Sequence, residues 1–419
     1  MKILHVCANY YPAFGGPQYT MKHLSEKLIE YYKDDVEVVT TDSLYGPELN
    51  LYEKINIPEE TINGVKIKRF PFRTWHYKII GLSSRAYKRL LKKPLPHAVR
   101  KYRWELDCKG IDNTMRINDC DVIMASTVNY MFCDYPLWRF KTKDPKPFVL
   151  YGSLHLEVDW SNYQAIINRA KICDCYIANT EYERKKLIEF GVQKEKIVTV
   201  GTGIDVADLA CNEASVQAFR NKNHIQDDDI LIGHIGRLSE GKGAGLLLDA
   251  FIQLYQKNKK CKLLLAGTAT DYTETLKQKV EQHKIPVIIF ENFENQLKPM
   301  LFNAIDIFVL ASGGESFGVV FLEAWACKKP IVATNMGATA SLLSEGKDSL
   351  LFAVTDIDEL VCKIEMLVND VALQRTLGIN GYNKVIENFS WPLIVKKYRE
   401  AYLKGIENFK TEYSNRVSA

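Results

Sequence analysis

Two glutamates eight positions apart are the residues best suited to do chemistry in this chain. Glu315 lies in a glycine-rich segment after an apolar run, and Glu323 lies in the apolar segment that follows. This pattern predicts a buried strand over 305–310, then a loop, then a helix that begins at about Phe317. Eight residues span a little over two helical turns, so we expect both carboxylates near one face. The N–H groups expected at the helix N-terminus, where an anion would bind, are those of Ser316, Phe317, Gly318 and Val319.

A second glycine-rich turn offers two cations. Arg237 and Lys242 follow the apolar run 230–235 and precede a segment with helical spacing of its apolar residues. They are five positions apart, so a planar guanidinium fork and a point charge could contact one diphosphate. Surface lysines and arginines are usually just solvated. Both cations, however, lie at the carboxyl end of a predicted strand, where open α/β sheets bind ligands.

A third glycine-rich turn lies near the N-terminus. Residues 3–8 predict a strand and residues 19–31 a helix, with Gly15 and Gly16 between them and Pro17 suited to the first helical turn. A glycine pair lets the backbone approach a ligand closely, although by itself it is weak evidence of a site.

Together these segments carry a resemblance to a known family. The motifs are Glu315-x7-Glu323, Gly236-Arg237 with Lys242, and Gly15-Gly16. In order and spacing they resemble the family 4 retaining glycosyltransferases of GT-B architecture along nearly the whole chain. The resemblance implies two Rossmann-like, doubly wound α/β domains that face each other across a cleft and a nucleotide sugar as donor.

The resemblance also implies roles for single residues. Glu323 would accept hydrogen bonds from the nucleotide ribose, and Glu315 would contact the hydroxyls of the donor sugar. Arg237 and Lys242, with N–H groups around Gly318, would stabilise the departing diphosphate in place of a metal ion. No Asp-x-Asp motif follows a predicted strand, so we expect neither a metal nor another cofactor.

His155 completes the expected set. It follows a predicted strand at 148–151 and a Gly-Ser turn, and the resemblance implies that it touches the donor sugar near the reacting carbon. A histidine is also a plausible general base because of its pKa. A loop histidine bonded to backbone is the alternative.

Length and periodicity favour two domains. A chain of 419 residues exceeds the size of one ordinary core. Strand and helix patterns alternate through both halves, which predicts parallel sheets covered by helices on both faces. We expect an N-terminal, acceptor-side domain over 1–203, joined by a C-terminal helix at 393–419, and a nucleotide-sugar-binding domain over 204–392.

Composition indicates a cytoplasmic protein. Hydrophobic residues make up 47% and charged residues 25%, as in ordinary globular proteins. No apolar run reaches the roughly 18 residues that cross a bilayer, and the first residues are too soon interrupted to form a signal peptide. The ten cysteines include no Cys-x2-Cys pair, so neither a zinc site nor a disulfide framework is expected.

Positive charge is concentrated in one segment. Residues 66–109 hold 14 Lys or Arg against two acids, 14 − 2 = +12, while the whole chain is +4. Aromatic and aliphatic residues interleave with these cations, which suits an anionic membrane surface. A solvated basic face beside an acceptor site is the alternative. We expect no nucleic-acid partner, because no nucleic-acid motif is present.

The sequence therefore predicts a retaining, metal-independent glycosyltransferase of the hexosyltransferase type, acting at or near the inner face of the membrane. Its donor would be UDP- or GDP-linked, and its acceptor a glycan or lipid-linked molecule in cell-surface polysaccharide or glycolipid synthesis. A soluble transferase with a small acceptor, an epimerase or phosphorylase of the same architecture, and a non-enzymatic glycan-binding descendant remain as alternatives.

Overall fold

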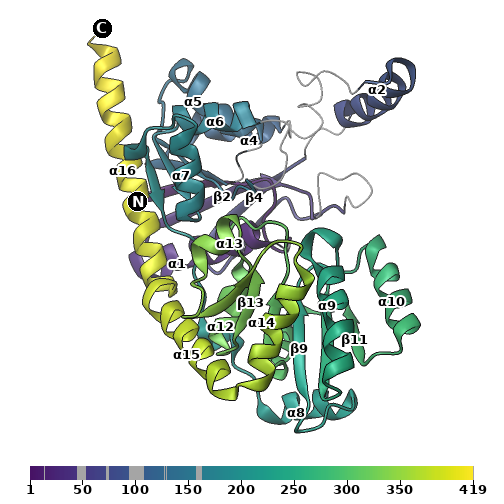
Figure 1. Cartoon of the computed structure of the whole chain (residues 1–419). Helices are drawn as coiled ribbons and strands as arrows, with labels where there is room; N and C mark the ends of the chain where they lie inside the picture. The colour runs from purple at the N-terminus through teal and green to yellow at the C-terminus, as the bar shows by residue number, and fades with distance from the viewer. Residues whose placement is uncertain are drawn as a thin grey trace. The chain divides into compact units, whose positions relative to one another are not determined.

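The chain forms two compact α/β units (Figure 1). The computed structural model describes residues 1–13, 15–44, 53–71, 75–93, 108–126, 128, 130–156 and 163–418. Unit 1 comprises Met1–Leu154, Asp159–Thr202 and Trp391–Ala419, and unit 2 comprises His155–Val158 and Gly203–Ser390. These boundaries lie within two residues of 203/204 and 392/393, except that the short segment at His155 groups with unit 2.

Unit 1 is built on an eight-stranded sheet. The strand order is β3-β4-β2-β1-β5-β6-β7-β8, and only the β3–β4 pair is antiparallel. The strands are β1 (Lys2–Val6), β2 (Asp35–Thr41), β3 (Glu59–Ile62), β4 (Val65–Phe70), β5 (Val122–Ser126), β6 (Phe148–Tyr151), β7 (Cys175–Ala178) and β8 (Ile197–Thr199). The central strands are buried along their whole length, as continuous apolar runs in a parallel sheet should be.

The helices of unit 1 follow the strands in the expected alternation. They are α1 (Gly16–Tyr32), α2 (Trp75–Leu91), α4 (Lys109–Ile117), α5 (Tyr135–Trp138), α6 (Tyr163–Ile172), α7 (Glu181–Glu189) and α16 (Trp391–Val417).

The C-terminal helix α16, yellow in Figure 1, packs on unit 1 against α1 and against strands β5, β6 and β7. Its apolar face is anchored by buried hydrogen bonds. Tyr398 donates to the carbonyl of Gly201 at 3.0 Å, and the Tyr402 hydroxyl lies 2.9 Å from His5 Nε2. The other ring nitrogen of His5 lies 2.7 Å from Ser25 Oγ, so both nitrogens of this buried histidine are satisfied.

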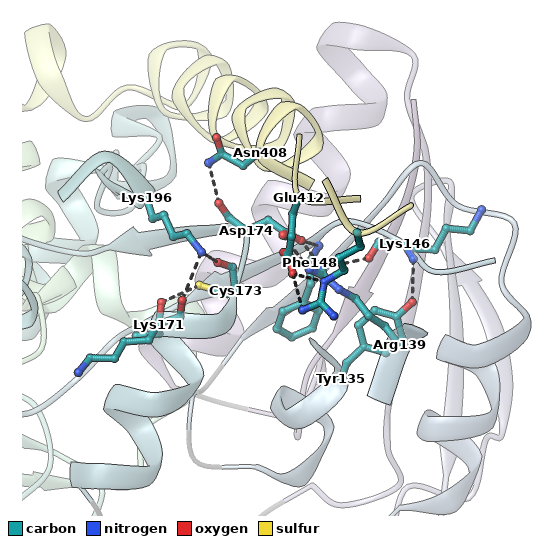
Figure 2. Close-up of polar contacts among 12 residues, drawn as sticks. Tyr135, Arg139, Lys146, Phe148, Lys171, Cys173, Asp174, Lys196, Asn408 and Glu412 are labelled. Atoms are coloured by element: carbon teal, nitrogen blue, oxygen red, sulfur yellow. Dashed lines mark hydrogen bonds and ion pairs between the residues drawn. The ribbon is translucent and has the colours of Figure 1, made fainter. Parts of the chain in front are cut away.

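A buried ion pair fixes the far end of α16 (Figure 2). The Arg139 guanidinium donates to both carboxylate oxygens of Asp174, at 2.5 and 3.0 Å, and to Glu412 of α16 at 2.9 Å. Asp174 also accepts from the backbone N–H of Phe148 at 2.7 Å, and its own carbonyl accepts from Asn408 at 2.8 Å. Strands β6 and β7, the segment at Arg139 and α16 are thereby joined by one polar network.

The basic segment 66–109 does not present one uniform basic face. Three of its cations lie on β4 and form ion pairs with acids of neighbouring strands. The pairs are Lys66–Asp35 at 3.1 Å, Lys68–Glu37 at 2.9 Å and Arg69–Glu60 at 2.5 Å. The unpaired positive charge of the described part therefore falls mainly on α2, while residues 72–74 and 94–107 lie outside the described residues.

Unit 2 is built on a six-stranded, wholly parallel sheet of order β11-β10-β9-β12-β13-β14. Its strands are β9 (Ile230–Ile235), β10 (Cys261–Gly267), β11 (Val287–Glu291), β12 (Ile307–Leu310), β13 (Ile331–Thr334) and β14 (Ser349–Phe352). Its helices are α8 (Glu213–Lys222), α9 (Ala244–Lys257), α10 (Asp271–His283), α11 (Lys298–Ala304), α12 (Val319–Ala326), α13 (Gly337–Leu342), α14 (Ile357–Asn369) and α15 (Val371–Asn388).

Both faces of this sheet are buried. Along β10, Leu263 and Leu265 pack with residues of α9 and α14, while Leu264 and Ala266 pack with residues of α11 and α12. Side chains of a strand alternate between faces, so this division shows helices on both sides of the sheet. The two doubly wound parallel sheets confirm the predicted fold class. Strands β3 and β14 were not predicted from the sequence.

Candidate active site

The strand order of unit 2 reverses between β9 and β12, which pair directly, Ile307 with Ile232 and Phe308 with Gly233. Parallel α/β sheets bind ligands at the carboxyl ends of such a pair, because the crossover connections leave in opposite directions there. Two of the three glycine-rich segments follow these two strands: 236–243 follows β9, and 312–318 follows β12. The sheet topology therefore brings together segments that lie about seventy residues apart in the chain.

Backbone hydrogen bonds hold these two loops against each other. The N–H of Gly313 donates to the carbonyl of Gly241 at 3.1 Å, and Ser312 Oγ donates to the same carbonyl at 3.3 Å. Thr334, at the end of β13, donates to the Ser312 carbonyl at 2.8 Å. The site residues thus stand on a fixed frame.

Each loop enters its helix through a glycine in the left-handed region. Gly243 (φ 72°) precedes α9, and a Cβ there would lie 1.9 Å from the carbonyl oxygen of Ala311. Gly318 (φ 85°) precedes α12, and a Cβ there would lie 2.5 Å from the ring of Phe321. Only glycine fits both the conformation and the space. Neither helix has a side-chain cap, so neither glycine competes with a ligand for the first N–H groups.

Lys242 and Glu315 form an ion pair across the two loops. Lys242 Nζ lies 2.6 Å from Glu315 Oε1, and the glutamate side chain is only 8% exposed. An ammonium group has three donors, so two remain available after this bond. Arg237, the other predicted cation, is exposed, and its side chain makes no hydrogen bond or ion pair with the described residues.

Glu323 forms an ion pair with a different lysine, Lys298. Its Oε1 accepts a hydrogen bond from Lys298 Nζ, and its Oε2 is buried without a hydrogen-bond partner in the described part of the chain. Helix α12 covers only Val319–Ala326, so Glu315 lies in the loop before it. The loop position of Glu315 agrees with the prediction, although the helix begins two residues later than expected. That both carboxylates lie near one face stays a prediction.

His155 groups with unit 2, and the charged side chains of this site act on the pKa of its ring. Burial lowers its pKa, and the nearby Lys242 and Arg237 lower it further, while Glu315 acts in the opposite direction. The ring is therefore held in its neutral form, which can accept a hydrogen bond or a proton. The sequence had assigned His155 to the N-terminal domain, and the contacts place its segment with unit 2 instead.

Sequence reasoning missed one residue beside the predicted ones. Lys298 was missed because it opens α11, 25 positions before Glu323, and no local pattern marks it. His234, on β9, is fully buried, and its ring interacts with the backbone of Arg237 and Val309 and with the charges of Lys242 and Glu315. Burial lowers the pKa of His234 to about 4, so it too is neutral.

Gly15 and Gly16 lie at the start of α1, in unit 1. A Cβ on Gly15 would lie 2.3 Å from the side-chain oxygen of Gln18. Their part in donor binding stays a prediction. Among the described residues, no group of three or more His, Cys, Asp or Glu side chains forms a candidate metal site.

The two units are each built on a mainly parallel sheet, and unit 2 carries glycine-rich loops and buried carboxylates at its topological switch point. This combination is that of the GT-B class of fold. Two family descriptions match the chain: "Glycosyl transferases group 1" over residues 215–384, and "Glycosyltransferase Family 4" over residues 14–208. The chain belongs to this group 1, family 4 class of glycosyltransferases, which confirms the predicted family.

Similar proteins are consistent with that assignment. The capsular polysaccharide biosynthesis glycosyltransferase CapM of Staphylococcus aureus is 26% identical over 54% of this chain and 60% of its own length. The uncharacterized glycosyltransferase MJ1607 of Methanocaldococcus jannaschii is 26% identical over 52% of this chain and 56% of its own length. The chain thus spans less than two thirds of the length of these two relatives. MJ1069 of the same organism is 23% identical over 96% of this chain and 98% of its own.

Solved structures share the fold. HepE of Anabaena in complex with UDP has a TM-score of 0.72 at 20% identity, covering 96% of this chain and 99% of that one. Sucrose-phosphate synthase from Thermosynechococcus elongatus has a TM-score of 0.70 at 17% identity, covering 96% and 99%.

Proposed function

We propose that this protein transfers a hexose from a UDP- or GDP-linked donor to a glycan or lipid-linked acceptor, with retention of configuration and without a metal ion. The product would enter a cell-surface polysaccharide or glycolipid. Relatives named for capsular polysaccharide synthesis in S. aureus and for lipopolysaccharide core synthesis in Rhizobium meliloti support the class of product. HepE structures described as complexes with UDP and with UDP-glucose support a nucleotide-sugar donor.

The observation that carries the proposal is the Lys242–Glu315 pair beside the exposed Arg237 at the switch point of unit 2. A diphosphate placed at the start of α9 and α12 would meet two cations and the free N–H groups of two helices. A sugar attached to that diphosphate would lie beside Glu315. The site therefore offers positive charge for the leaving group and a carboxylate for hydroxyls, which are the two demands of glycosyl transfer.

The proposed chemistry uses this arrangement. The bond between the anomeric carbon and the diphosphate oxygen breaks as the acceptor hydroxyl attacks from the same face. The departing phosphate oxygen takes the acceptor's proton. Lys242 and Arg237 stabilise the negative charge that develops on the diphosphate, and the buried surroundings strengthen that effect. Because Lys242 holds the Glu315 carboxylate in place, that carboxylate is positioned to bind the donor sugar when the diphosphate arrives.

Calorimetric titration of the protein with UDP, GDP and their common sugar forms, in excess EDTA, tests donor and metal together. We expect micromolar binding of one nucleotide family that EDTA does not change. Binding that returns only with Mg²⁺ or Mn²⁺ would refute the cation-based site.

Substitution of the site residues tests the assignment of roles. Lys242→Ala and Glu323→Ala should each remove most turnover while the circular dichroism spectrum stays unchanged. Lys363→Met serves as a matched control, because the Lys363–Glu345 pair (2.6 Å) joins α14 to the segment before β14, outside the site. Near-normal turnover in both site variants would contradict the proposal.

We further propose that α2 of unit 1 contacts an anionic membrane surface. Ile79, Leu82 and Leu90 are 54%, 66% and 80% exposed, and with Ala86 their spacing of three, four and four places them on one helical face. Arg85, Lys88 and Arg89 are exposed on the same helix, and none forms an ion pair with the described residues. An amphipathic helix of this kind lies in the membrane interface with its apolar face down. No described helix is long and apolar enough to span a bilayer.

Co-sedimentation with vesicles tests this contact. Binding to vesicles rich in phosphatidylglycerol, and not to phosphatidylcholine alone, is expected, and it should weaken with salt. Replacing Arg85, Lys88, Arg89, Lys92 and Lys93 by Gln should weaken binding at least tenfold, since each cation near such a surface contributes about 1 kcal/mol. Lys66→Gln with Lys68→Gln is the control, because both lysines are already paired with acids. Unchanged binding of the five-residue variant would support the alternative, a soluble transferase with a small acceptor, as the relative named D-inositol 3-phosphate glycosyltransferase suggests.

A further inference from the structure

Glu323 is a carboxylate inside an apolar helix. From Phe321 to Ala326 every residue of α12 is buried, and the neighbours of Glu323 on both sides, Leu322 and Ala324, are fully so. A carboxylate in such surroundings loses its hydration, so hydrogen-bond donors or a cation must replace the water.

Lys298 is the only ion-pair partner that the described residues provide. Its Nζ donates to Glu323 Oε1, while Oε2 is shielded from solvent and has no donor. The lysine is itself only partly exposed, at 31%. One ammonium group therefore compensates the whole charge of this glutamate, and the carboxylate keeps acceptor capacity that the described residues do not use.

The backbone of Lys298 is well anchored. It is the first residue of α11, which is fixed by the fully buried side chains of Leu301 and Phe302 and by Asn303, which donates to the carbonyl of Leu209 at 2.9 Å. Lysine at this point is thus held toward Glu323 by a rigid element, not by a flexible loop.

We propose that Lys298 is a positioning residue for the nucleotide: it holds the carboxylate of Glu323 in place, so that the unused acceptor capacity of the carboxylate binds the two vicinal hydroxyls of the ribose. The inference rests on the proposed function, in which Glu323 meets the ribose. It assigns to Lys298 the selection of ribonucleotides over 2′-deoxyribonucleotides, an effect that Lys298 exerts through Glu323 without touching the sugar.

The test compares Lys298→Met, Lys298→Arg, Glu323→Gln and the double variant Lys298→Met/Glu323→Gln, with Lys363→Met as control. Calorimetry measures the binding of the nucleoside diphosphate that the wild type binds, and of its 2′-deoxy form. We expect Lys298→Met to bind the ribonucleotide at least tenfold more weakly and to lose most of the preference for ribose. Lys298→Arg should regain most of both, and the control should match the wild type.

The double variant separates positioning from a general structural effect. If Lys298 acts through Glu323, the double variant binds no more weakly than Glu323→Gln alone. Additive losses, or equal weakening of ribo- and deoxyribonucleotide by Lys298→Met, would overturn the inference, and so would unchanged binding. A wild-type protein that binds no nucleotide would refute the proposed function itself, and this inference with it.

Discussion

Arg139→Met is the perturbation whose effect the structure specifies most closely. The side chains of Arg139 and Asp174 are each 1% exposed, and the guanidinium binds both carboxylate oxygens (Figure 2). Methionine keeps much of the volume and the flexible stem but removes the charge and the donors. Asp174 would keep only the Phe148 N–H and lose its cation, while Glu412, 34% exposed, could turn toward solvent.

The size of the expected loss of stability follows from the Asp174 carboxylate, which would stay buried without its cation. Breaking a buried ion pair by removing one partner costs about 3–5 kcal/mol, because the remaining charge is left without compensation. Loss of the Glu412 contact adds little, since that residue is partly solvated. We therefore expect the free energy of unfolding of unit 1 to fall by about 3–5 kcal/mol. With a urea dependence of about 2 kcal/mol/M, the midpoint should move down by roughly 2 M.

The pKa of Asp174 indicates how the loss of stability in Arg139→Met should change with pH. Burial already raises the pKa of Asp174 despite the attraction of Arg139, and without the arginine it would rise further. A raised carboxyl pKa disfavours the folded state above that pKa, so the loss should be greatest near neutral pH and shrink as pH falls and Asp174 takes a proton.

Urea unfolding followed by circular dichroism, at pH 7.5 and pH 5, would measure both effects. Asp174→Asn in the Arg139→Met background should restore part of the lost stability, because it removes the stranded charge. Lys186→Met is the control, since the Lys186–Glu189 pair is on the surface of α7. A loss below about 1 kcal/mol, or a double variant as unstable as the sum of the single ones, would refute this reasoning.

The remaining predictions concern histidines and a glycine. Burial lowers the pKa of His5 to about 3 and of His234 to about 4, whereas an unfolded histidine takes a proton near 6.5. The stability that these neutral histidines contribute is thus complete above about pH 6.5 and is lost as pH falls, by roughly 2–3 kcal/mol each at pH 4.5. Urea unfolding between pH 6.5 and pH 4.5 would detect this loss. A free energy of unfolding that does not change over that range would contradict the prediction. Gly243→Ala should destabilise unit 2 by about 1–3 kcal/mol and weaken nucleotide binding, because its Cβ would meet the Ala311 carbonyl in a left-handed conformation. Gly241→Ala has open space and should leave thermal stability nearly unchanged.

The elements that carry the site were predictable because their signals are local. Apolar runs marked β9 and β12, and glycines marked the turns after them, since a strand buried on both faces and a left-handed turn each demand particular residue types. Arg237, Lys242 and Glu315 were expected at these turns, and the structure places Lys242 and Glu315 in direct contact. Their catalytic and binding roles stay predictions.

Ion pairs between residues far apart in the sequence were not predictable. Nothing near Lys298 in sequence indicates that it meets Glu323, and the start of α12 at Val319 is set by the conformation of Gly318, which a periodicity pattern locates only to within a turn. Strand β3 was missed because it is short and half exposed, as edge strands often are.

By itself, the sequence determined the class of fold, the strands that could be buried and the loops that could bind a phosphate, because each follows from residue type and short-range spacing. Only the tertiary structure decided which lysine neutralises which glutamate and how α16 is held through Arg139, Asp174 and Glu412. The physical reason is that charge compensation depends on distance in space. Parallel strand order and helix packing set that distance, and they join residues from 25 to 273 positions apart.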